Sequence, residues 1–228
     1  MAIWDELTGQ ADAIAVVEAA AAASRVGGSD DSSMTHSWLI TGPPGSGRSN
    51  LAYAFATALL GGDDEATRRQ VQARTHPDLG VLATERVIIS IEEVRQLVAT
   101  SQFSPSVGRY RVMVIEDADR MTERTSNVLL KALEEPPPRT VWILCAPSEA
   151  DLIPTIRSRV RTVRLRVPSV DEVEPARTAG RGGCRDRDPR RERSPVAHRH
   201  GTPTRHQCSG PPAARAHAGC GAGHPLGV

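Results

Sequence analysis

Apolar side chains nearly disappear from this sequence after residue 173. The last 55 residues contain one Leu and two Val, with no Ile, Met, Phe, Tyr or Trp, but nine Gly, seven Pro and ten Arg. A segment of this kind cannot bury enough apolar surface to offset the conformational entropy that folding removes. We therefore expect residues 174–228 to be a disordered tail. A folded domain is expected only in the first 173 residues, which are enough for one complete hydrophobic core.

The balance of charge changes at the same place. Residues 1–173 carry 18 basic and 23 acidic side chains, whereas the tail carries ten and four. The folded part therefore has no overall positive field for nucleic acid, so any DNA contact must come from a local patch. Only Cys145 lies outside the tail, inside an apolar run, and we expect it to be a buried small hydrophobe. No charged leader and no membrane-length apolar run occurs, so we expect a cytoplasmic protein.

Apolar runs alternate with helical patterns along the first 173 residues. We expect strands at Ser37–Thr41, Leu79–Ala83, Tyr110–Ile115, Val141–Ala146 and Thr162–Val167. We expect helices over residues 10–25, 49–60, 90–99 and 122–135, with a polar stretch at 61–78. Ser90 and Glu93 form a capping box that begins the third helix. This alternation predicts an α/β domain with a parallel sheet covered by helices on both faces.

A glycine-rich loop follows the first predicted strand. Its eight residues are Gly42, Pro43, Pro44, Gly45, Ser46, Gly47, Arg48 and Ser49. They fit the phosphate-loop (P-loop) pattern G-x-x-x-x-G-K-[ST], except that Arg48 replaces the Lys, and the pattern stands between a strand and a helix as it should. Such a loop directs backbone N–H groups and a helix N-terminus at phosphates. Arg is planar and wider than Lys, so we expect ATP or ADP at low occupancy and little or no hydrolysis.

Two acidic residues, Glu116 and Asp117, follow the third predicted strand. Open α/β sheets bind their ligands at the carboxyl ends of strands. ATPases need an Asp here for magnesium and a Glu beside it to orient water, whereas this chain has the reverse order. We expect Glu116 and Ser49 to hold magnesium weakly, and Asp117 to reach the attacking water poorly. Ordinary acids on a solvated turn are the alternative interpretation.

Four ordered motifs resemble those of clamp-loader subunits of the AAA+ family. Residues Asn127–Pro137 (NVLLKALEEPP) match the signature NxLLKxLEEPP, and Ile156–Arg161 is similar to the SRC motif, with Val160 in place of Cys. The opening Leu7–Gln10 and the THPDL segment at 75–79 also resemble this family. The resemblance covers residues 1 to about 170. Within the class, the Arg-containing loop and the Glu-Asp order are similar to delta-prime subunits of bacterial DNA polymerase III rather than to gamma/tau motor subunits.

The resemblance implies an AAA+ P-loop αβα domain over residues 1–167, with a five-stranded parallel sheet, and the start of a helical lid at 168–173. It implies a stator that hydrolyses little or no ATP and supports ATP-dependent loading of the sliding clamp onto primed DNA. Arg159, in the SRC-like motif, would act in trans on the ATP of a neighbouring subunit. The implied partners are gamma/tau and delta subunits and, through the complex, the sliding clamp and primed DNA at the replisome, with no membrane.

Three departures from the family pattern change these expectations. Residues 61–78 contain no Cys where the family usually has a four-cysteine zinc module, so we expect no zinc. Ser148 stands where a Thr or Asn usually senses the γ-phosphate, which further lowers the expected hydrolysis. The resemblance stops at residues 168–173, so the tail takes the place of the helical lid and collar.

Several alternatives stay open. Residues 174–228 fit an out-of-frame translation of a GC-rich gene, a genuine disordered tail whose arginines contact DNA phosphates, or a His/Cys metal site, although their spacing matches no zinc pattern. The whole chain could instead be an active AAA+ ATPase motor subunit of the gamma/tau type, or a truncated remnant that assembles with no partner.

Overall fold

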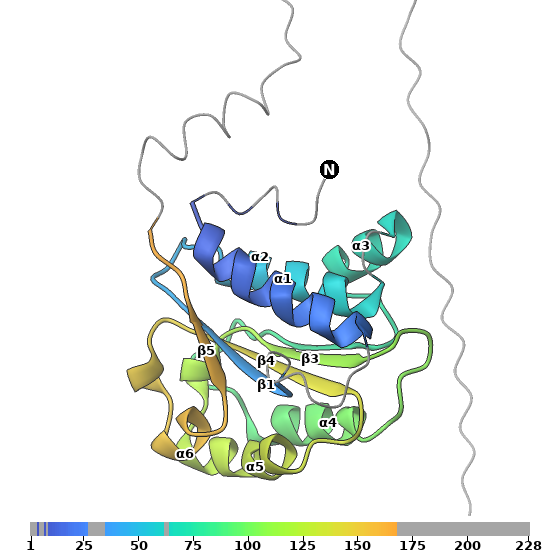
Figure 1. The fold of residues 1–228 in the computed structure, drawn as a ribbon. Coiled ribbons are helices and arrows are strands. Elements are labelled where there is room, and N and C mark those ends of the chain that lie inside the picture. Colours follow the sequence, from blue (N-terminus) through green and yellow to red (C-terminus); the bar gives the residue numbers. More distant parts are fainter. Residues whose placement is uncertain (1–3, 5–6, 8, 27–34, 62–63, 168–228) are drawn as a thin grey trace, which may run out of the picture. The chain divides into compact units, whose positions relative to one another are not determined.

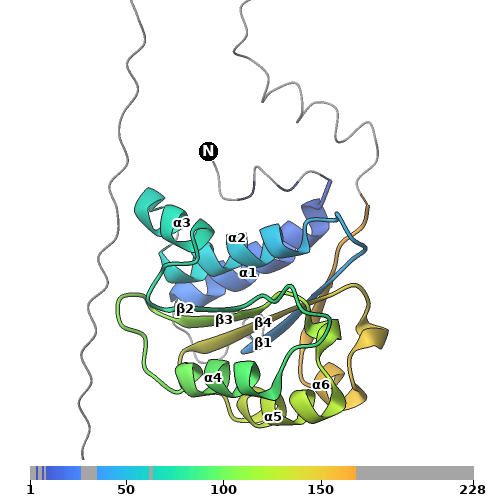
Figure 2. The ribbon, with the colours of Figure 1, turned by 180° about the vertical axis from the view of Figure 1, so that it is seen from behind.

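The computed structural model describes residues 4, 7, 9–26, 35–61 and 64–167, all within one compact unit. These residues form a parallel sheet with helices on both faces (Figures 1 and 2). The predicted lid start at 168–173 and the predicted tail at 174–228 lie outside the described residues. No helix in the described ranges is long and apolar enough to cross a membrane.

The sheet has five parallel strands in the order β2-β3-β4-β1-β5. Their bounds are β1 Ser37–Thr41, β2 Leu79–Leu82, β3 Arg111–Ile115, β4 Thr140–Ala146 and β5 Arg161–Arg164. Ile40 of β1 pairs with Cys145 of β4 on one side and with Val163 of β5 on the other. The first strand of the chain therefore lies between the last two, and the loop that follows it reaches the carboxyl edge of the sheet near those of β4 and β5. The predicted five-stranded parallel sheet is confirmed.

Every residue of β1, β3 and β4 is buried. Such strands are covered by helices on both faces, which is why they appear in the sequence as continuous apolar runs rather than alternating patterns. Along β4 the side chains alternate between two cores, with Ile143 and Cys145 in one and Trp142 and Leu144 in the other. The buried Cys145 confirms the prediction of a small hydrophobe.

Helices cover both faces of the sheet (Figures 1 and 2), and the described residues contribute three to each face. On one face lie α1 Ala11–Val26, α2 Arg48–Leu60 and α3 Glu65–Gln72. On the other lie α4 Ile91–Ser101, α5 Glu123–Glu134 and α6 Pro154–Arg157. Ser90 and Glu93 form the predicted capping box of α4, and the Thr122 hydroxyl accepts the Thr125 N–H at the start of α5.

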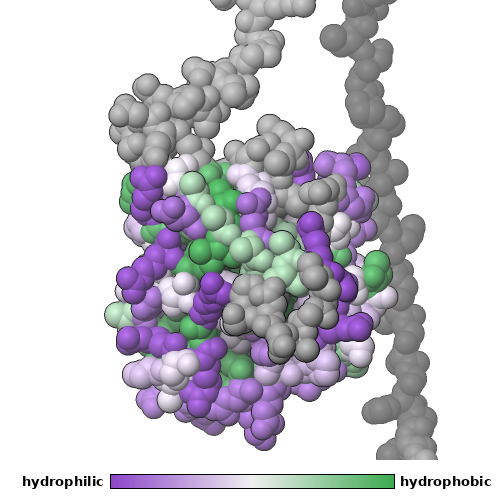
Figure 3. All heavy atoms as spheres, viewed as in Figure 1, coloured by the Kyte–Doolittle hydropathy of each residue, from purple (hydrophilic) through white to green (hydrophobic). Residues whose placement is uncertain are grey.

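Helix α1 is formed mainly by alanine, which has the highest helix propensity. Its exposed face contains Ala15, Ala19 and Ala22, and a weakly apolar band runs over this helix in Figure 3. The prediction of α1 thus depended on composition and not on a strong amphipathic pattern.

Helix α3 was not predicted, because the stretch 61–78 looked uniformly polar. The Asp64 carboxylate caps the helix by accepting the Thr67 N–H at 2.9 Å, and Val71 is the buried residue of the helix. A short surface helix with a single buried side chain leaves no periodic apolar signal. The short helix α6 escaped prediction for the same reason, with Ile156 as its buried residue.

Candidate functional site

The predicted phosphate loop, Gly42–Ser49, joins the carboxyl end of β1 to the start of α2. Gly45 and Gly47 have φ values of +82° and +89°, which side chains other than Gly rarely permit. A Cβ atom at Gly42 would lie 2.6 Å from Ser46 Oγ. No side chain caps α2, because Gly47 occupies the capping position, so its first N–H groups are available to an acceptor from outside the helix.

The Ser46 side chain is buried, and its hydroxyl has no hydrogen-bond partner among the described residues. An unpaired buried hydroxyl is unfavourable, and a phosphate oxygen in the loop would satisfy it. In front of Gly45, no atom lies within 4 Å of where a Cβ would be. The orphaned hydroxyl and the open space in front of Gly45 are compatible with a phosphate group at the loop.

Arg48 turns back onto its own loop. Its Nη1 donates to the carbonyl oxygen of Gly42 at 3.0 Å, and so connects the two ends of the loop. Cys145 lies beneath, with its Sγ 4.0 Å from the Arg48 carbonyl oxygen. Burial raises the pKa of the Cys145 thiol to about 12, so it stays a neutral thiol near neutral pH.

Gln10 connects the loop to Arg166, just after β5, by hydrogen bonds. The sequence did not predict this contact. Its Nε2 donates to the Arg166 carbonyl at 2.6 Å and to the Ser46 carbonyl at 3.4 Å, while its Oε1 accepts the Arg166 N–H at 3.2 Å. The only sequence signal was that Gln10 ends the family-like opening Leu7–Gln10. Its function here is to fix the loop against the sheet.

Glu116, directly after β3, lies beside the loop. One carboxylate oxygen, Oε2, accepts a hydrogen bond from Ser49 Oγ at 3.1 Å. The other, Oε1, accepts the Tyr53 hydroxyl and lies 2.7 Å from Arg74 Nη2. Burial and the bond to Glu116 raise the pKa of Tyr53, which keeps the phenol protonated as a donor. Sequence reasoning missed both Tyr53 and Arg74, which join Glu116 only through the tertiary fold.

Asp117 does not accompany its neighbour. Its carboxylate pairs with Arg120 Nη2 at 3.6 Å, on the short turn Ala118–Arg120. The two predicted acidic residues therefore have different partners, and a role for Asp117 at the nucleotide stays a prediction.

An open hollow of about 490 Å³ adjoins the loop at the carboxyl ends of β1, β4 and β5. Gly42 and Pro43 line it from the loop, and Ser148 and Arg157 line it from beyond β4. Its size lies in the range of small-molecule pockets. The Ser148 hydroxyl accepts the Ala150 N–H at 3.2 Å, as the cap of a short turn.

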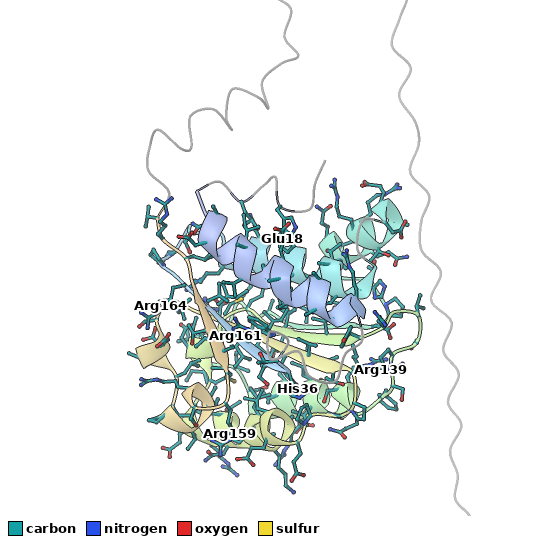
Figure 4. The ribbon with its side chains drawn as sticks, viewed as in Figure 1. Glu18, His36, Arg139, Arg159, Arg161 and Arg164 are labelled. Carbon is teal, nitrogen blue, oxygen red and sulfur yellow. The ribbon has the colours of Figure 1, made fainter. Side chains whose placement is uncertain are left out.

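Arg159 lies at the opposite edge of the sheet. It precedes β5, whereas the phosphate loop follows β1, and the two parallel strands pair directly from Trp38–Arg161 to Thr41–Arg164. Strands of this length place the two sites about 15 Å apart along the sheet. The Arg159 guanidinium lies on the side of α5 and α6 (Figure 4), 2.7 Å from the Glu134 carboxylate and donating to the Thr155 carbonyl at 2.7 Å.

The described residues contain no group of three or more His, Cys, Asp or Glu side chains that could hold a metal ion. The predicted magnesium ligands, Ser49 and Glu116, do lie together. Glu116, however, already neutralises the guanidinium of Arg74, so the side chains as arranged do not fit a magnesium ion.

Residues 27–169 match the protein family described as "DNA polymerase III, delta subunit". The chain is 37% identical to the DNA polymerase III subunit delta' of Pseudomonas aeruginosa, over 54% of this chain and 41% of that protein. It is 32% identical to the subunit delta' of Escherichia coli, over 58% of this chain and 43% of that protein. It is also 29% identical to the tau/gamma subunit of Haemophilus influenzae, over 64% of this chain and 22% of that protein.

Solved structures agree on the fold. A DNA polymerase III gamma subunit-related protein of Thermotoga maritima superposes with a TM-score of 0.54 at 25% identity, over 67% of this chain and 46% of that chain. The RuvB Holliday junction branch migration motor of the same organism gives 0.52 at 20% identity, over 75% of this chain and 50% of that chain, which shows a shared fold alone.

Proposed function

The chain belongs to the delta-prime family of DNA polymerase III subunits, and from this premise we propose that it serves as the stator of a clamp loader. In this role it would sit beside gamma/tau and delta subunits and support ATP-dependent placement of the sliding clamp on primed DNA, in the cytoplasm. Its similarity to a tau/gamma subunit supports a place in such a complex. The chain spans about two fifths of the length of the delta-prime relatives, so the proposal concerns the work of the AAA+ domain.

The position of Arg159 is the observation that carries this proposal. An arginine at the amino edge of the sheet cannot serve a phosphate loop at the carboxyl edge of the same chain. Its side chain is 36% exposed and is paired with Glu134, a residue of the family-like segment 127–137. In the proposed complex, Arg159 leaves Glu134 for the γ-phosphate of the nucleotide on the neighbouring motor subunit. There the guanidinium stabilises the negative charge that develops in the transition state.

The chain's own loop is proposed to bind ATP or ADP at low occupancy without hydrolysing it. Three features support this division of labour. Arg48 bonds to the loop itself, Glu116 is paired with an arginine, and the Ser148 hydroxyl caps a turn. None of these side chains is left in the arrangement that activates a water molecule for attack on phosphate.

The test is the substitution Arg159→Ala in the full chain, assembled with gamma/tau and delta subunits. We expect the clamp- and DNA-stimulated ATPase of the complex to fall roughly tenfold or more, because an arginine finger contributes on the order of 10³-fold at the site it serves. Nucleotide binding by this chain alone should not change. The matched control is Arg124→Ala, an exposed arginine of α5, which should leave the ATPase intact.

Other outcomes decide between the alternatives. An assembled Arg159→Ala complex with full ATPase would remove the trans role. Failure of the wild-type chain to assemble would favour the truncated remnant. Turnover by the isolated chain that Arg48→Ala abolishes would favour an active motor subunit.

A further inference from the structure

Arg74, four residues before the buried Asp78, has an unusual backbone. It is one of two described residues other than Gly with a positive φ, at +57°, the second being Arg139 at +62°. Side chains rarely adopt this conformation because the Cβ atom crowds the backbone. Here the conformation belongs to the C-terminal cap of α3, in which the Thr75 N–H donates to the Gln70 carbonyl at 2.8 Å and the Arg74 N–H to the Val71 carbonyl at 3.0 Å.

This backbone conformation delivers the Arg74 guanidinium to the phosphate-loop site. Arg74 Nη2 lies 2.7 Å from Glu116 Oε1, and the guanidinium carbon lies 5.5 Å from the centre of the Tyr53 ring. Its side chain is 49% exposed, so the ion pair contributes little to folding stability. The cap of α3 accounts for the backbone conformation of Arg74, and the ion pair places its guanidinium at Glu116.

Both oxygens of Glu116 are engaged by donors from this chain. Ser49 binds Oε2, while Tyr53 and Arg74 bind Oε1. Magnesium requires oxygen ligands in octahedral geometry with several retained waters. A guanidinium in direct contact with the carboxylate neutralises it and repels a second cation.

We propose that Arg74 is a built-in cation that takes the place of magnesium, so that the phosphate loop binds a nucleoside di- or triphosphate without a divalent metal. This inference rests on the proposed function only in assuming that the loop binds nucleotide. It replaces the expectation that Ser49 and Glu116 hold magnesium. The positive charge that would balance the outer phosphates would come from Arg74, which follows the end of α3.

The first measurement is calorimetric titration of the full chain with ADP, in magnesium and in EDTA. The variant is Arg74→Gly, because Gly accepts the positive φ while the side chain that carries the guanidinium is removed. The control is Arg139→Gly, which relieves the same backbone conformation at an exposed residue before β4, at the other edge of the sheet (Figure 4).

We expect the wild-type chain and the Arg139→Gly control to bind ADP equally in both buffers, within about twofold. We expect Arg74→Gly to bind ADP roughly tenfold more tightly in magnesium than in EDTA, because a divalent ion can now reach Glu116. A wild-type chain that loses its ADP affinity in EDTA would overturn the proposal. So would an Arg74→Gly chain that gains no dependence on magnesium.

A second measurement needs no nucleotide. Mn²⁺ is titrated into each full-length variant and the free ion is followed by electron paramagnetic resonance. Arg74→Gly should bind Mn²⁺ at least tenfold or so more tightly than the wild-type chain, and the added substitution Glu116→Gln should remove the gain. No gain would overturn the inference while leaving the stator role standing. If Arg74→Gly gained Mn²⁺ affinity although neither it nor the wild-type chain bound ADP, the proposed nucleotide binding would be refuted. The role of Arg74 as a cation that excludes the metal would be supported.

Discussion

Strand β3 has a carboxylate–arginine pair at each end. The two pairs have the same charges but differ in burial, in distance and in their other hydrogen-bond partners. At its amino end, Asp78 is fully buried and lies 3.2 Å from Arg111 Nη2, which is also buried. At its carboxyl end, Glu116 is 15% exposed and lies 2.7 Å from the half-exposed Arg74. The shorter distance belongs to the pair that is open to water, so distance alone does not rank these interactions.

The amino-end pair belongs to a buried hydrogen-bond network centred on the Asp78 carboxylate. The Asp78 carboxylate accepts the N–H groups of Ser106, Val107 and Gly108 at 2.5, 2.7 and 2.8 Å, in addition to the Arg111 guanidinium. The His76 Nδ1 accepts the Asp78 N–H at 3.1 Å, and burial lowers the pKa of His76, which favours the neutral ring. One carboxylate thus organises the loop that leads from α4 into β3.

The carboxyl-end pair faces the phosphate loop. Its arginine comes from the C-terminal cap of α3, and its carboxylate also accepts hydrogen bonds from a serine and a tyrosine. Ligands of open α/β sheets bind at carboxyl ends of strands. The two ends of β3 therefore have different functions. The buried pair Asp78–Arg111 stabilises the fold at the amino end, and the accessible pair Glu116–Arg74 at the carboxyl end can exchange partners.

The largest expected effect is on stability at the amino end. Asp78→Ala leaves the Arg111 guanidinium buried without its counter-ion and removes the acceptor of three loop N–H groups. We expect the free energy of unfolding, from urea denaturation of the full chain, to fall by about 3–5 kcal/mol. The matched variant Glu116→Ala should cost less than about 1 kcal/mol, because water can solvate Arg74. Equal losses at the two ends would break the comparison.

The next largest effect is on the pH dependence of folding stability, through the same Asp78 carboxylate. Burial alone would raise the pKa of Asp78, but the hydrogen bonds from residues 106–108 and the Arg111 charge outweigh burial and lower it. A carboxylate with a lowered pKa in the folded state stabilises above its unfolded pKa of about 3.9, and this stabilisation is lost as the pH falls through the folded value. We therefore expect the stability difference between the wild-type chain and Asp78→Asn to be largest near pH 7 and to shrink below about pH 4. A difference that stays constant down to pH 3 would contradict the assignment.

Much of this architecture could be predicted because its signals are local. Strands β1, β3 and β4 are short apolar runs, and the caps of α4 and α5 are each encoded within a few residues. Strand β5, Arg161–Arg164, starts and ends earlier than the apolar run expected at Thr162–Val167, because only Val163 of this edge strand is buried. The phosphate loop is a contiguous pattern, so its residues could be named from the sequence alone. The family resemblance, carried by four contiguous motifs, supplied the strand count and pointed to Arg159.

What could not be predicted depends on contacts between distant segments. Tyr53 and Arg74 reach Glu116 from residues 63 and 42 positions earlier in the chain, and no local pattern announces either one. Glu134 and Arg159 belong to two separate family-like motifs, and only the fold shows that they pair. A positive φ at an arginine also has no sequence signature, because the conformation disfavours every residue other than Gly.

The smallest expected effect on stability is at the phosphate loop. It tests the contrast between the carboxyl ends of the strands, where the loop lies, and their amino ends, where Asp78 stabilises the fold. Ser46→Ala removes a buried hydroxyl that has no partner in the described part of the chain, so the free energy of unfolding should stay unchanged or rise by up to about 1 kcal/mol. The ADP affinity proposed for the loop should fall roughly threefold to tenfold, because a phosphate oxygen loses its donor.

Ser101→Ala is the control, since this buried hydroxyl donates to the Val98 carbonyl at 2.7 Å. It should cost about 0.5–1.5 kcal/mol and leave ADP affinity alone. A Ser46 variant that is destabilised like the Ser101 variant would mean that the loop hydroxyl serves the fold. A variant that keeps its stability and loses affinity would mean that the hydroxyl is held for a ligand, at a carboxyl edge that is organised for binding rather than for stability.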